Sequence, residues 1–340
     1  MKKLFGSLCL AWFALWLPAA QAQPFNVGLR LTSVDYLDTR IDVALWYPTK
    51  SDERPLALGP YQFQVARDAE PAVKARPLVV ISHGTGGNMF GHFDLAEALA
   101  RRGYVVAALT HPGDNYRDRS LVADARYFSE RPHQVSVVLD ALLARPDLAP
   151  LIDAQRIGAI GHSAGGHTVA ALLGGRPDVQ RVREHCAVHA ADDPMCSFAN
   201  PNYGVAYPQA TSFKLPAGGP VADTAADPRI RAAVLMAPVG AAIAPGSMAS
   251  VQVPVLLLAA AHDEVLAPRW HAQYLANEIA GVRTVVEPDA GHYSFIAPVA
   301  PELLYMLGPA GKDPAGFDRG EFHRRLAPVI VAFFDQAWPR

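Results

Sequence analysis

Residues 156–166 read RIGAIGHSAGG, and this stretch decides the fold that we expect. Its apolar run at 157–160 is typical of a strand buried on both faces of a parallel sheet. A turn with the pattern G-x-S-x-G follows, and residues 168–173 favour a helix. Strand, sharp turn and helix around such a serine make a nucleophile elbow. The pattern alone also occurs by chance in Gly/Ser-rich loops, but its flanks favour Ser163 as a nucleophile.

The composition is that of a globular protein with a large core. The 340 residues are 51% apolar and 18% charged, which is unlike a disordered chain. The formal net charge is −2 and no Lys/Arg-rich run stands out, so we expect no nucleic-acid partner. Neither a repeat nor a shift in composition marks a second domain, and we predict one domain over residues 23–340.

The first 22 residues have the three parts of a secretory signal peptide. Lys2 and Lys3 form a basic start, residues 4–17 an apolar run, and residues 20–22 (AQA) a cleavage signal. The apolar run is shorter than the ~20 residues of a membrane-spanning helix, which disfavours the alternative of an uncleaved anchor. We therefore expect cleavage after Ala22, no stable membrane anchor afterwards, and a secreted, periplasmic protein.

Removal of the signal peptide leaves Cys186 and Cys196 as the cysteine pair of an exported protein. Cysteines in an oxidising compartment tend to pair, so we predict a disulfide between them. A catalytic thiol and a metal site are the alternatives, and both lack the neighbouring residues that they require.

Strands and helices alternate along most of the chain. This pattern predicts an α/β fold with a mostly parallel sheet and helices on both faces. Residues 25–32 and 40–47 favour an antiparallel pair of strands ahead of the main sheet, and residues 51–76 an irregular surface segment. The strands expected in the main sheet are 77–82, 104–109, 157–160, 231–236, 253–259 and 284–287. The expected helices are 93–102, 132–144, 168–173, 270–279 and 322–338.

The alternation stops after the helix that follows Ser163. Residues 174–228 contain many Pro, Gly, Asp and Asn residues, little periodicity and both cysteines of the mature chain. A stretch of this length without clear structure is typical of a functional lid or an insertion. We predict an irregular lid that covers the substrate site.

Two further residues meet the requirements of a serine nucleophile. A serine hydroxyl needs a base to take its proton and a carboxylate to orient that base. After a nucleophile elbow these partners follow in the order serine, acid, histidine. Asp263 follows the strand at 253–259 and His292 the strand near Val285, and functional groups gather at such carboxyl ends of parallel strands. We predict Asp263 as the acid and His292 as the base.

Neighbouring residues offer alternatives for these roles. Glu264 could replace Asp263 as the acid. Asp289 could orient the base, although it is too near that histidine in sequence to reach its ring easily. The chain has 12 histidines, most of which must be surface or packing residues. We expect His162 and His83 to support the loops beside the nucleophile.

The negative charge on the tetrahedral intermediate requires N–H donors, the oxyanion hole. One donor is the backbone N–H of Ala164, the residue after the nucleophile. The second is expected in the loop HGTGG after the strand at 77–82, where we choose Thr85. A phosphate-binding loop is the alternative, but HGTGG lacks the G-K-[ST] ending and the G-x-G-x-x-G spacing. The sequence also lacks H-E-x-x-H and C-x-x-C motifs, and we expect neither a metal nor a cofactor.

Seven segments carry a resemblance to a known family: WYPT near Trp46, SHGTGG, THPGD, RPHQVSVVLDAL, GHSAGG, the turn at Asp263, and AGHYSF. On these segments the chain resembles the α/β-hydrolase family, and within it the secreted dienelactone-hydrolase-like group related to platelet-activating-factor acetylhydrolases. The resemblance spans most of the mature chain and fades in the lid. It implies a serine esterase with Ser163, Asp263 and His292 as triad and Thr85 and Ala164 as oxyanion donors. True dienelactone hydrolases use a cysteine nucleophile, so the serine departs from their pattern.

The sequence therefore predicts a serine hydrolase that cleaves small or polymeric carboxylic esters through an acyl-enzyme. Amide or peptide hydrolysis is the alternative, since the same triad serves both and only leaving-group protonation differs. A binding protein that has lost catalysis is a further alternative, against which the intact triad argues. The oligomeric state stays open. The residues expected to flank the pocket, in loops beyond the strand ends, are Met89, Phe90, His111, Asp114, Tyr293 and Phe295.

Overall fold

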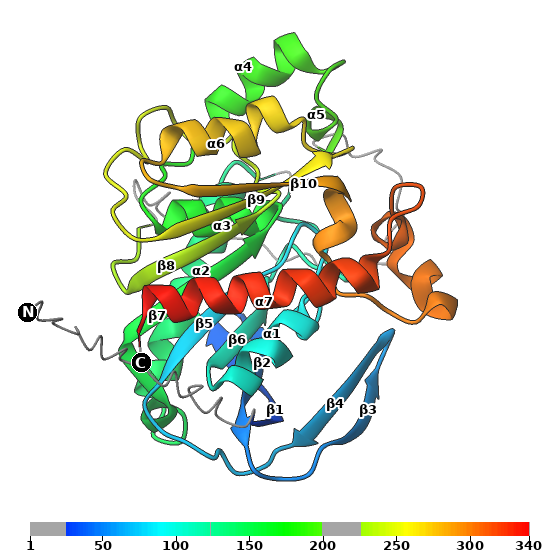
Figure 1. Ribbon diagram of the computed structural model, residues 1–340. Helices are drawn as coiled ribbons and strands as arrows, with labels where there is room; N and C mark the ends of the chain where they lie inside the picture. The colour runs from blue at the N-terminus through cyan, green and yellow to red at the C-terminus, as the bar shows by residue number, and fades with distance from the viewer. Residues whose placement is uncertain (1–24, 123, 199–225, 340) are drawn as a thin grey trace, which may run out of the picture.

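The computed structural model describes residues 25–122, 124–198 and 226–339 (Figure 1). The signal peptide predicted for residues 1–22 lies outside the described residues. So do residues 199–225 of the predicted lid at 174–228.

The strands form one ten-stranded sheet in the order β10-β9-β8-β7-β5-β6-β2-β1-β4-β3. From β10 to β6 each strand runs parallel to its neighbour, whereas β2 pairs antiparallel with both β6 and β1. The predicted antiparallel pair is thus present, and it extends the main sheet. The strands are β1 (Asn26–Tyr36), β2 (Thr39–Thr49), β3 (Arg54–Leu58), β4 (Tyr61–Arg67), β5 (Arg76–Ser82), β6 (Val105–Thr110), β7 (Ile152–His162), β8 (Ile230–Met236), β9 (Val255–His262) and β10 (Arg283–Gly291).

Helices cover both faces of this sheet. In Figure 1, α1 and α7 lie side by side in front of it, and α2, α3 and α6 pack on the opposite face. The helices are α1 (Phe93–Arg102), α2 (Tyr127–Ala144), α3 (Ala164–Leu172), α4 (Val179–His189), α5 (Met195–Phe198), α6 (Ala272–Glu278) and α7 (Arg319–Ala337). The 3-10 helices are η1 (Ala149–Leu151), η2 (Pro268–Trp270), η3 (His292–Phe295) and η4 (Pro301–Gly311). The helix predicted at 270–279 is divided between η2 and α6.

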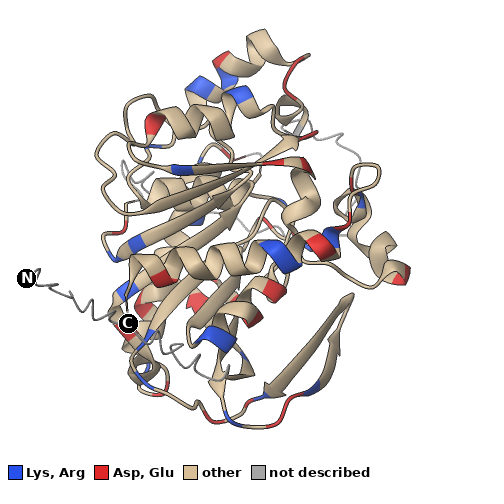
Figure 2. Ribbon diagram, in the orientation of Figure 1, with Lys and Arg blue, Asp and Glu red and all other residues tan. Residues whose placement is uncertain are grey.

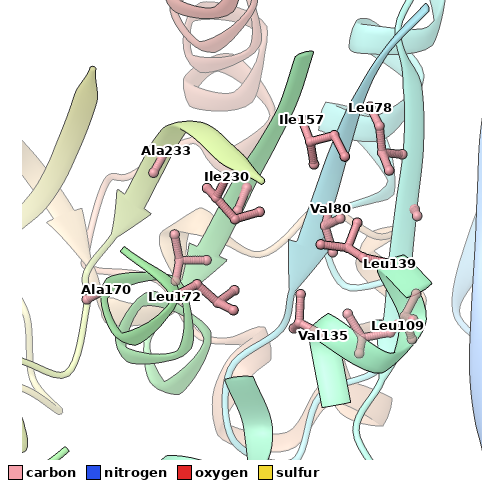
Figure 3. Close-up of a cluster of buried hydrophobic side chains, with 14 of the residues drawn as sticks. Leu78, Val80, Leu109, Val135, Leu139, Ile157, Ala170, Leu172, Ile230 and Ala233 are labelled. Carbon is pink, nitrogen blue, oxygen red and sulfur yellow. The ribbon is translucent and has the colours of Figure 1, made fainter. Parts of the chain in front are cut away.

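Strand β5 shows why the centre of the sheet is apolar on both faces. Successive side chains of a strand point to opposite faces. Leu78 and Val80 accordingly pack toward α2 and α3, and Val79 and Ile81 toward α1 and α7. Each of the four is at most 1% exposed. Figure 3 shows the first cluster, in which side chains of β5 to β8 meet those of α2 and α3: Leu78, Leu109, Ile157, Ile230, Val135, Leu139 and Leu172.

Charged residues lie on the outer parts of the structure. Figure 2 shows Lys and Arg interspersed with Asp and Glu over helices and loops, while the central strands are free of charge over most of their length. Both signs are mixed, in line with the net charge of −2. Among the helices of the described residues, none combines the length and apolar character of a membrane span.

Residues 51–76 are not the irregular segment that the sequence predicts. They contain the antiparallel hairpin β3–β4, with Gly59 at φ +58° in its turn. Tyr61, Phe63 and Val65 of β4 are buried and alternate with exposed glutamines. This alternation is the period-two pattern of a half-buried strand, and the prolines and charges on either side of it hide the signal.

Helix α2 begins at Tyr127, before the start predicted at Pro132. A proline inside a helix has no N–H for the carbonyl four residues earlier. Here that carbonyl, on Phe128, accepts a hydrogen bond from His167 Nε2 of α3 at 3.3 Å. The helix tolerates Pro132 because its neighbour supplies the missing donor.

The described part of the predicted lid contains helices α4 and α5, so it is not wholly irregular. Asp178 caps α4 by accepting the backbone N–H of Arg181 at 2.9 Å. No side chain of α4 is fully buried. The helix therefore has no continuous apolar stripe, which is the periodic signal that predicts a helix from sequence.

Candidate active site

Ser163 lies in the turn between β7 and α3, at φ 57° and ψ −118°. A positive φ is costly for a residue with a Cβ and persists only where its surroundings enforce it. The neighbouring glycines provide that enforcement. A Cβ on Gly161 would lie 2.0 Å from the Gly165 carbonyl oxygen, and one on Gly165 would lie 1.9 Å from that of Ser82. Only glycine allows strand and helix to pass this closely. The sharp turn that results directs Ser163 toward the cavity described below.

A line of hydrogen bonds joins Ser163 to two distant loops. Ser163 Oγ lies 2.9 Å from His292 Nε2, and His292 Nδ1 lies 2.9 Å from Asp263 Oδ2. An ionised carboxylate only accepts hydrogen bonds, so Nδ1 carries the ring proton and Nε2 accepts from the serine hydroxyl. The second carboxylate oxygen accepts the N–H groups of Val265 at 3.0 Å and Leu266 at 2.7 Å. These bonds fix the carboxylate on the turn after β9, with its side chain 4% exposed.

Glu264 and Asp289, the alternative acids, lie elsewhere. Glu264 Oε2 accepts the backbone N–H of His292 at 2.9 Å, so it anchors the main chain of the histidine while Asp263 contacts the ring. Asp289 is exposed on β10. The structure therefore brings Asp263, of these three carboxylates, to the imidazole.

Thr85 and Ala164, the predicted oxyanion donors, lie in the two segments that border Ser163. Ala164 is the first residue of α3. The loop of Thr85 passes close to this serine, since a Cβ on Gly84 would lie 3.2 Å from the Cβ of Ser163. Within the described residues, neither N–H donates a hydrogen bond to the protein, whereas the next N–H in the loop, on Gly86, donates to Asp114 at 2.8 Å. Both therefore remain candidates for the oxyanion hole.

A cavity of about 1290 Å³ opens over Ser163 and His292. Three of the residues predicted to flank the pocket line it: Met89, Phe90 and Tyr293. The other three, His111, Asp114 and Phe295, are fully buried and are absent from its wall, which corrects the prediction. Their position after a strand end correctly predicted that these residues lie near the site. It could not predict the direction in which their side chains point. Lining residues that the sequence did not single out include Tyr61, Tyr127, Phe128, Val182, Met195 and Tyr305.

His162 supports the loop of the candidate base. Its Nε2 donates to the carbonyl oxygen of His292 at 3.0 Å, and the two rings lie with centroids 5.0 Å apart and planes tilted by 39°. Burial holds the pKa of His162 well below its usual value of 6.5. The ring is therefore neutral, and it adds no positive charge next to His292.

Helices α4 and α5 form one side of the cavity and are tied together by a disulfide. Cys186 and Cys196 are bonded, as predicted, and Cys186 faces the cavity with Val182. Buried Asp193 fastens these helices to the body of the fold, because one of its oxygens accepts from His185 at 2.7 Å and from His271 at 2.8 Å.

The cluster His185, Asp193 and Cys196 has donor atoms within 4.8 Å of one another. Such atoms could hold a metal ion, but the sulfur of Cys196 is committed to the disulfide. The carboxylate of Asp193 already accepts two imidazole N–H groups and the backbone N–H of Met195. These contacts explain the cluster as a hydrogen-bonded anchor.

Comparison with known proteins agrees with this architecture. The model of the alpha/beta hydrolase family matches residues 78–302. Among solved structures, the chain is similar to a ferulic acid esterase from Streptomyces cinnamoneus, with 22% identity and a TM-score of 0.64, over 94% of this chain and 92% of that one. It is also similar to a puromycin hydrolase, with 15% identity and a TM-score of 0.55, over 92% of this chain and 39% of that one. A search of curated proteins gave no match.

The family match includes the elbow and the strands on either side of it, and the fold agrees with that of the structural neighbours. The chain belongs to the alpha/beta hydrolase family.

Proposed function

We propose that this hydrolase is a serine esterase that cleaves carboxylic esters through an acyl-enzyme. The observation that carries the proposal is the continuous line of hydrogen bonds from Ser163 Oγ through His292 to Asp263, each 2.9 Å long. Nucleophile, base and orienting carboxylate are the parts that acyl transfer by serine requires.

In this proposal Ser163 attacks the ester carbonyl carbon while His292 Nε2 takes the hydroxyl proton. The N–H groups of Thr85 and Ala164 stabilise the oxyanion. Collapse of the tetrahedral intermediate expels the alcohol, which takes the proton from His292, and leaves the acyl group on the serine. Water then attacks the acyl-enzyme with His292 again as base, which releases the acid. Asp263 holds the imidazole in the required tautomer throughout.

The size and lining of the cavity support an ester with a large acyl or alcohol part. A volume of about 1290 Å³ exceeds the roughly 300–1,000 Å³ of most small-molecule sites. Aromatic side chains line it, among them Tyr61, Phe90, Phe128 and Tyr293. One structural neighbour is a ferulic acid esterase, so esters of aromatic acids belong in the first substrate panel.

We further propose that the enzyme is exported and that residues 174–228 form its lid. The signal-peptide pattern, with cleavage after Ala22, and the cysteine pair support a periplasmic location. The positions of Val182, Cys186 and Met195 favour the proposal of a lid, since all three residues line the cavity. The segments WYPT, THPGD and AGHYSF support a place in the secreted dienelactone-hydrolase-like group, and the serine at the elbow sets the chain apart from true dienelactone hydrolases, which use a cysteine.

Hydrolysis of p-nitrophenyl esters of graded acyl length, with methyl ferulate and the matching p-nitroanilides, tests this function. We expect wild type to hydrolyse esters and Ser163→Ala to lose that activity. Ser247→Ala is the matched control, because Ser247 donates to the Ala244 carbonyl away from the cavity. Its rate should equal that of wild type.

Each other outcome has a definite meaning. Ester hydrolysis that persists in Ser163→Ala would refute the assignment of the nucleophile. Anilide cleavage faster than ester cleavage would favour the amidase alternative. A wild type inactive on every substrate of the panel, although it binds one of them, would favour a binding protein.

A further inference from the structure

The segments THPGD and RPHQVSVVLDAL contribute no reacting atom, yet they contain a fully buried ion pair. Asp114 and Arg131 have side chains 0% and 1% exposed and are hydrogen-bonded to each other. A buried ion pair is weak support for stability, because desolvation offsets much of the attraction. What this pair contacts is therefore more informative than its existence.

Asp114 fastens the loop that contains Thr85. Its Oδ1 accepts the backbone N–H of Gly86 at 2.8 Å. Its Oδ2 accepts the hydroxyl of Tyr127 at 2.8 Å and a guanidinium N–H of Arg131. The carboxylate thus holds the peptide unit next to the Thr85 N–H.

Arg131 ties the start of the same loop to the elbow helix. Its Nη2 donates to the carbonyl of His83 and, at 3.3 Å, to Ser82 Oγ at the end of β5. Its Nε donates to Thr168 Oγ1 of α3 at 3.2 Å. One side chain therefore fixes the distance between this loop and the helix that begins at Ala164.

Tyr127 completes the link to Thr85. Its oxygen lies 2.8 Å from Thr85 Oγ1 and 2.8 Å from Asp114 Oδ2. The carboxylate can only accept, so the Tyr127 hydroxyl donates to Asp114 and the threonine hydroxyl donates to Tyr127. The direction of both bonds is fixed, and so is the orientation of Thr85.

His83 acts on the peptide unit that carries the Thr85 N–H. Its Nε2 accepts the N–H of His111 at 3.1 Å, so its Nδ1 carries the proton and donates to the Gly84 carbonyl at 2.6 Å. Gly87 N–H donates to the same carbonyl at 3.0 Å. Hydrogen bonds in a chain polarise one another, so two donors on this C=O strengthen the N–H at the other end of the peptide.

We propose that His83, Asp114, Tyr127 and Arg131 are positioning residues that hold the Thr85 N–H in place as an oxyanion donor. The inference rests on the proposed esterase function. These residues act through the loop and contact no reacting atom. Their contribution is realised when charge develops on the oxyanion, so it belongs to the transition state and not to substrate binding.

Tyr127→Phe tests the network, since it removes only the hydroxyl that joins Asp114 to Thr85. We expect kcat for a p-nitrophenyl ester to fall roughly tenfold, because the donor is displaced and not removed. KM should change less than about twofold. The inhibition constant of an alkyl boronic acid, which forms a tetrahedral adduct on serine, should rise in step with the loss of kcat. Tyr47→Phe, which removes a buried hydroxyl bonded to the Ala69 carbonyl, is the matched control and should leave all three unchanged.

Thr85→Val and Thr85→Ser provide a second test that leaves Tyr127 intact. Valine removes the hydroxyl and should reproduce the effect of Tyr127→Phe, whereas serine keeps the hydroxyl and should restore the rate. If the wild type is active and kcat is unchanged in both Tyr127→Phe and Thr85→Val, this inference is overturned while the proposed function stands. A rise in KM without a rise in the boronic acid constant would also overturn it. An inactive wild type would overturn the proposed function and this inference with it.

Discussion

The adjacent carboxylates of Asp263 and Glu264 hold His292 at two different points. Asp263 contacts the ring at Nδ1, and Glu264 accepts the backbone N–H of the same residue. Both lie in the turn after β9. Ring orientation and main-chain position are thus set by separate side chains, and substitutions can separate the two effects.

Asp263→Asn should lower kcat for a p-nitrophenyl ester by about 10³–10⁴-fold. An amide cannot stabilise the imidazolium, and it favours the wrong tautomer of the ring. Glu264→Gln keeps an acceptor for the backbone N–H of His292 and should cost less than about tenfold. Steady-state rates for the two variants check this prediction, and a larger loss in Glu264→Gln than in Asp263→Asn would refute it.

The sequence could predict Ser163, Asp263 and His292 as a set because order along the chain and position after a strand are readable from it. The structure brings the three within hydrogen-bond distance. The roles of Tyr127 and Arg131 could not be predicted in the same way. Both lie on α2, whose predicted start at Pro132 left them in a loop, and their contacts depend on how that helix packs.

At the scale of elements, the disulfide between α4 and α5 stabilises one wall of the cavity. It closes a loop with a sequence separation of 10 residues. Asp193, between the two helices, is bonded to His271 near α6. The wall is therefore fastened twice, once within itself and once to the body of the fold.

Replacing Cys186 and Cys196 together by serine should lower the free energy of unfolding by about 3 kcal/mol, the entropy gained by opening a loop of this length. KM should rise for long acyl chains and stay close to wild type for an acetate, because Val182 and Cys186 belong to the cavity wall that the disulfide holds, and a larger acyl group relies more on that wall. Denaturant unfolding and the chain-length profile of KM measure both effects. Equal stability with and without the disulfide would contradict this account.

The elements that the sequence missed share a physical cause. The hairpin β3–β4 buries mainly alternate residues of β4, and α4 buries none completely. Both lie at the margin of the fold, where the periodic apolar signal is weak. The central strands and α7 bury continuous apolar sets, and their predicted positions agree with the structure to within a few residues.

For the whole molecule, buried ionisable groups determine how stability depends on pH. Burial lowers the pKa of a set of neutral histidines: His83, His92, His111, His162 and His167. The pKa of His92 falls from 6.5 to about 4. Because the folded pKa lies below the unfolded one, each histidine contributes stability above pH 6.5 that is lost as the pH falls, about 3 kcal/mol for His92.

Two carboxyl groups act in the opposite direction. Burial raises the pKa of Glu97 from 4.5 to about 8 and that of Glu130 to about 7. Their stabilising contribution is complete below pH 4.5 and is lost as the pH rises through these values.

The free energy of unfolding should therefore be greatest at roughly pH 6.5, where the histidines are neutral and Glu97 is still protonated. Denaturant unfolding at pH values from 4 to 9 measures the profile. Glu97→Gln should flatten the decline between pH 6.5 and 8 and steepen the rise from pH 4.5 to 6.5, because the stability that Glu97 contributes is lost progressively between its unfolded pKa of 4.5 and its folded pKa of about 8. Stability that is constant, or that increases as the pH falls from 6.5 to 4, would contradict the assignment of neutral buried histidines.

The overall architecture could be predicted because alternating strands and helices admit few arrangements other than a covered parallel sheet. The order of the edge strands β1-β4-β3 could not be predicted, because no sequence pattern indicates that β1 pairs parallel with β4.

The central claim is that Ser163 is the nucleophile of an acyl-enzyme, and covalent labelling tests it most directly. Mature protein treated with a fluorophosphonate and analysed by peptide mass spectrometry should carry one phosphonyl group on Ser163. Ser163→Ala should carry none, and His292→Ala should react much more slowly, since the imidazole no longer takes the hydroxyl proton. Labelling of another residue, or an unlabelled Ser163 in folded wild type, would contradict the account.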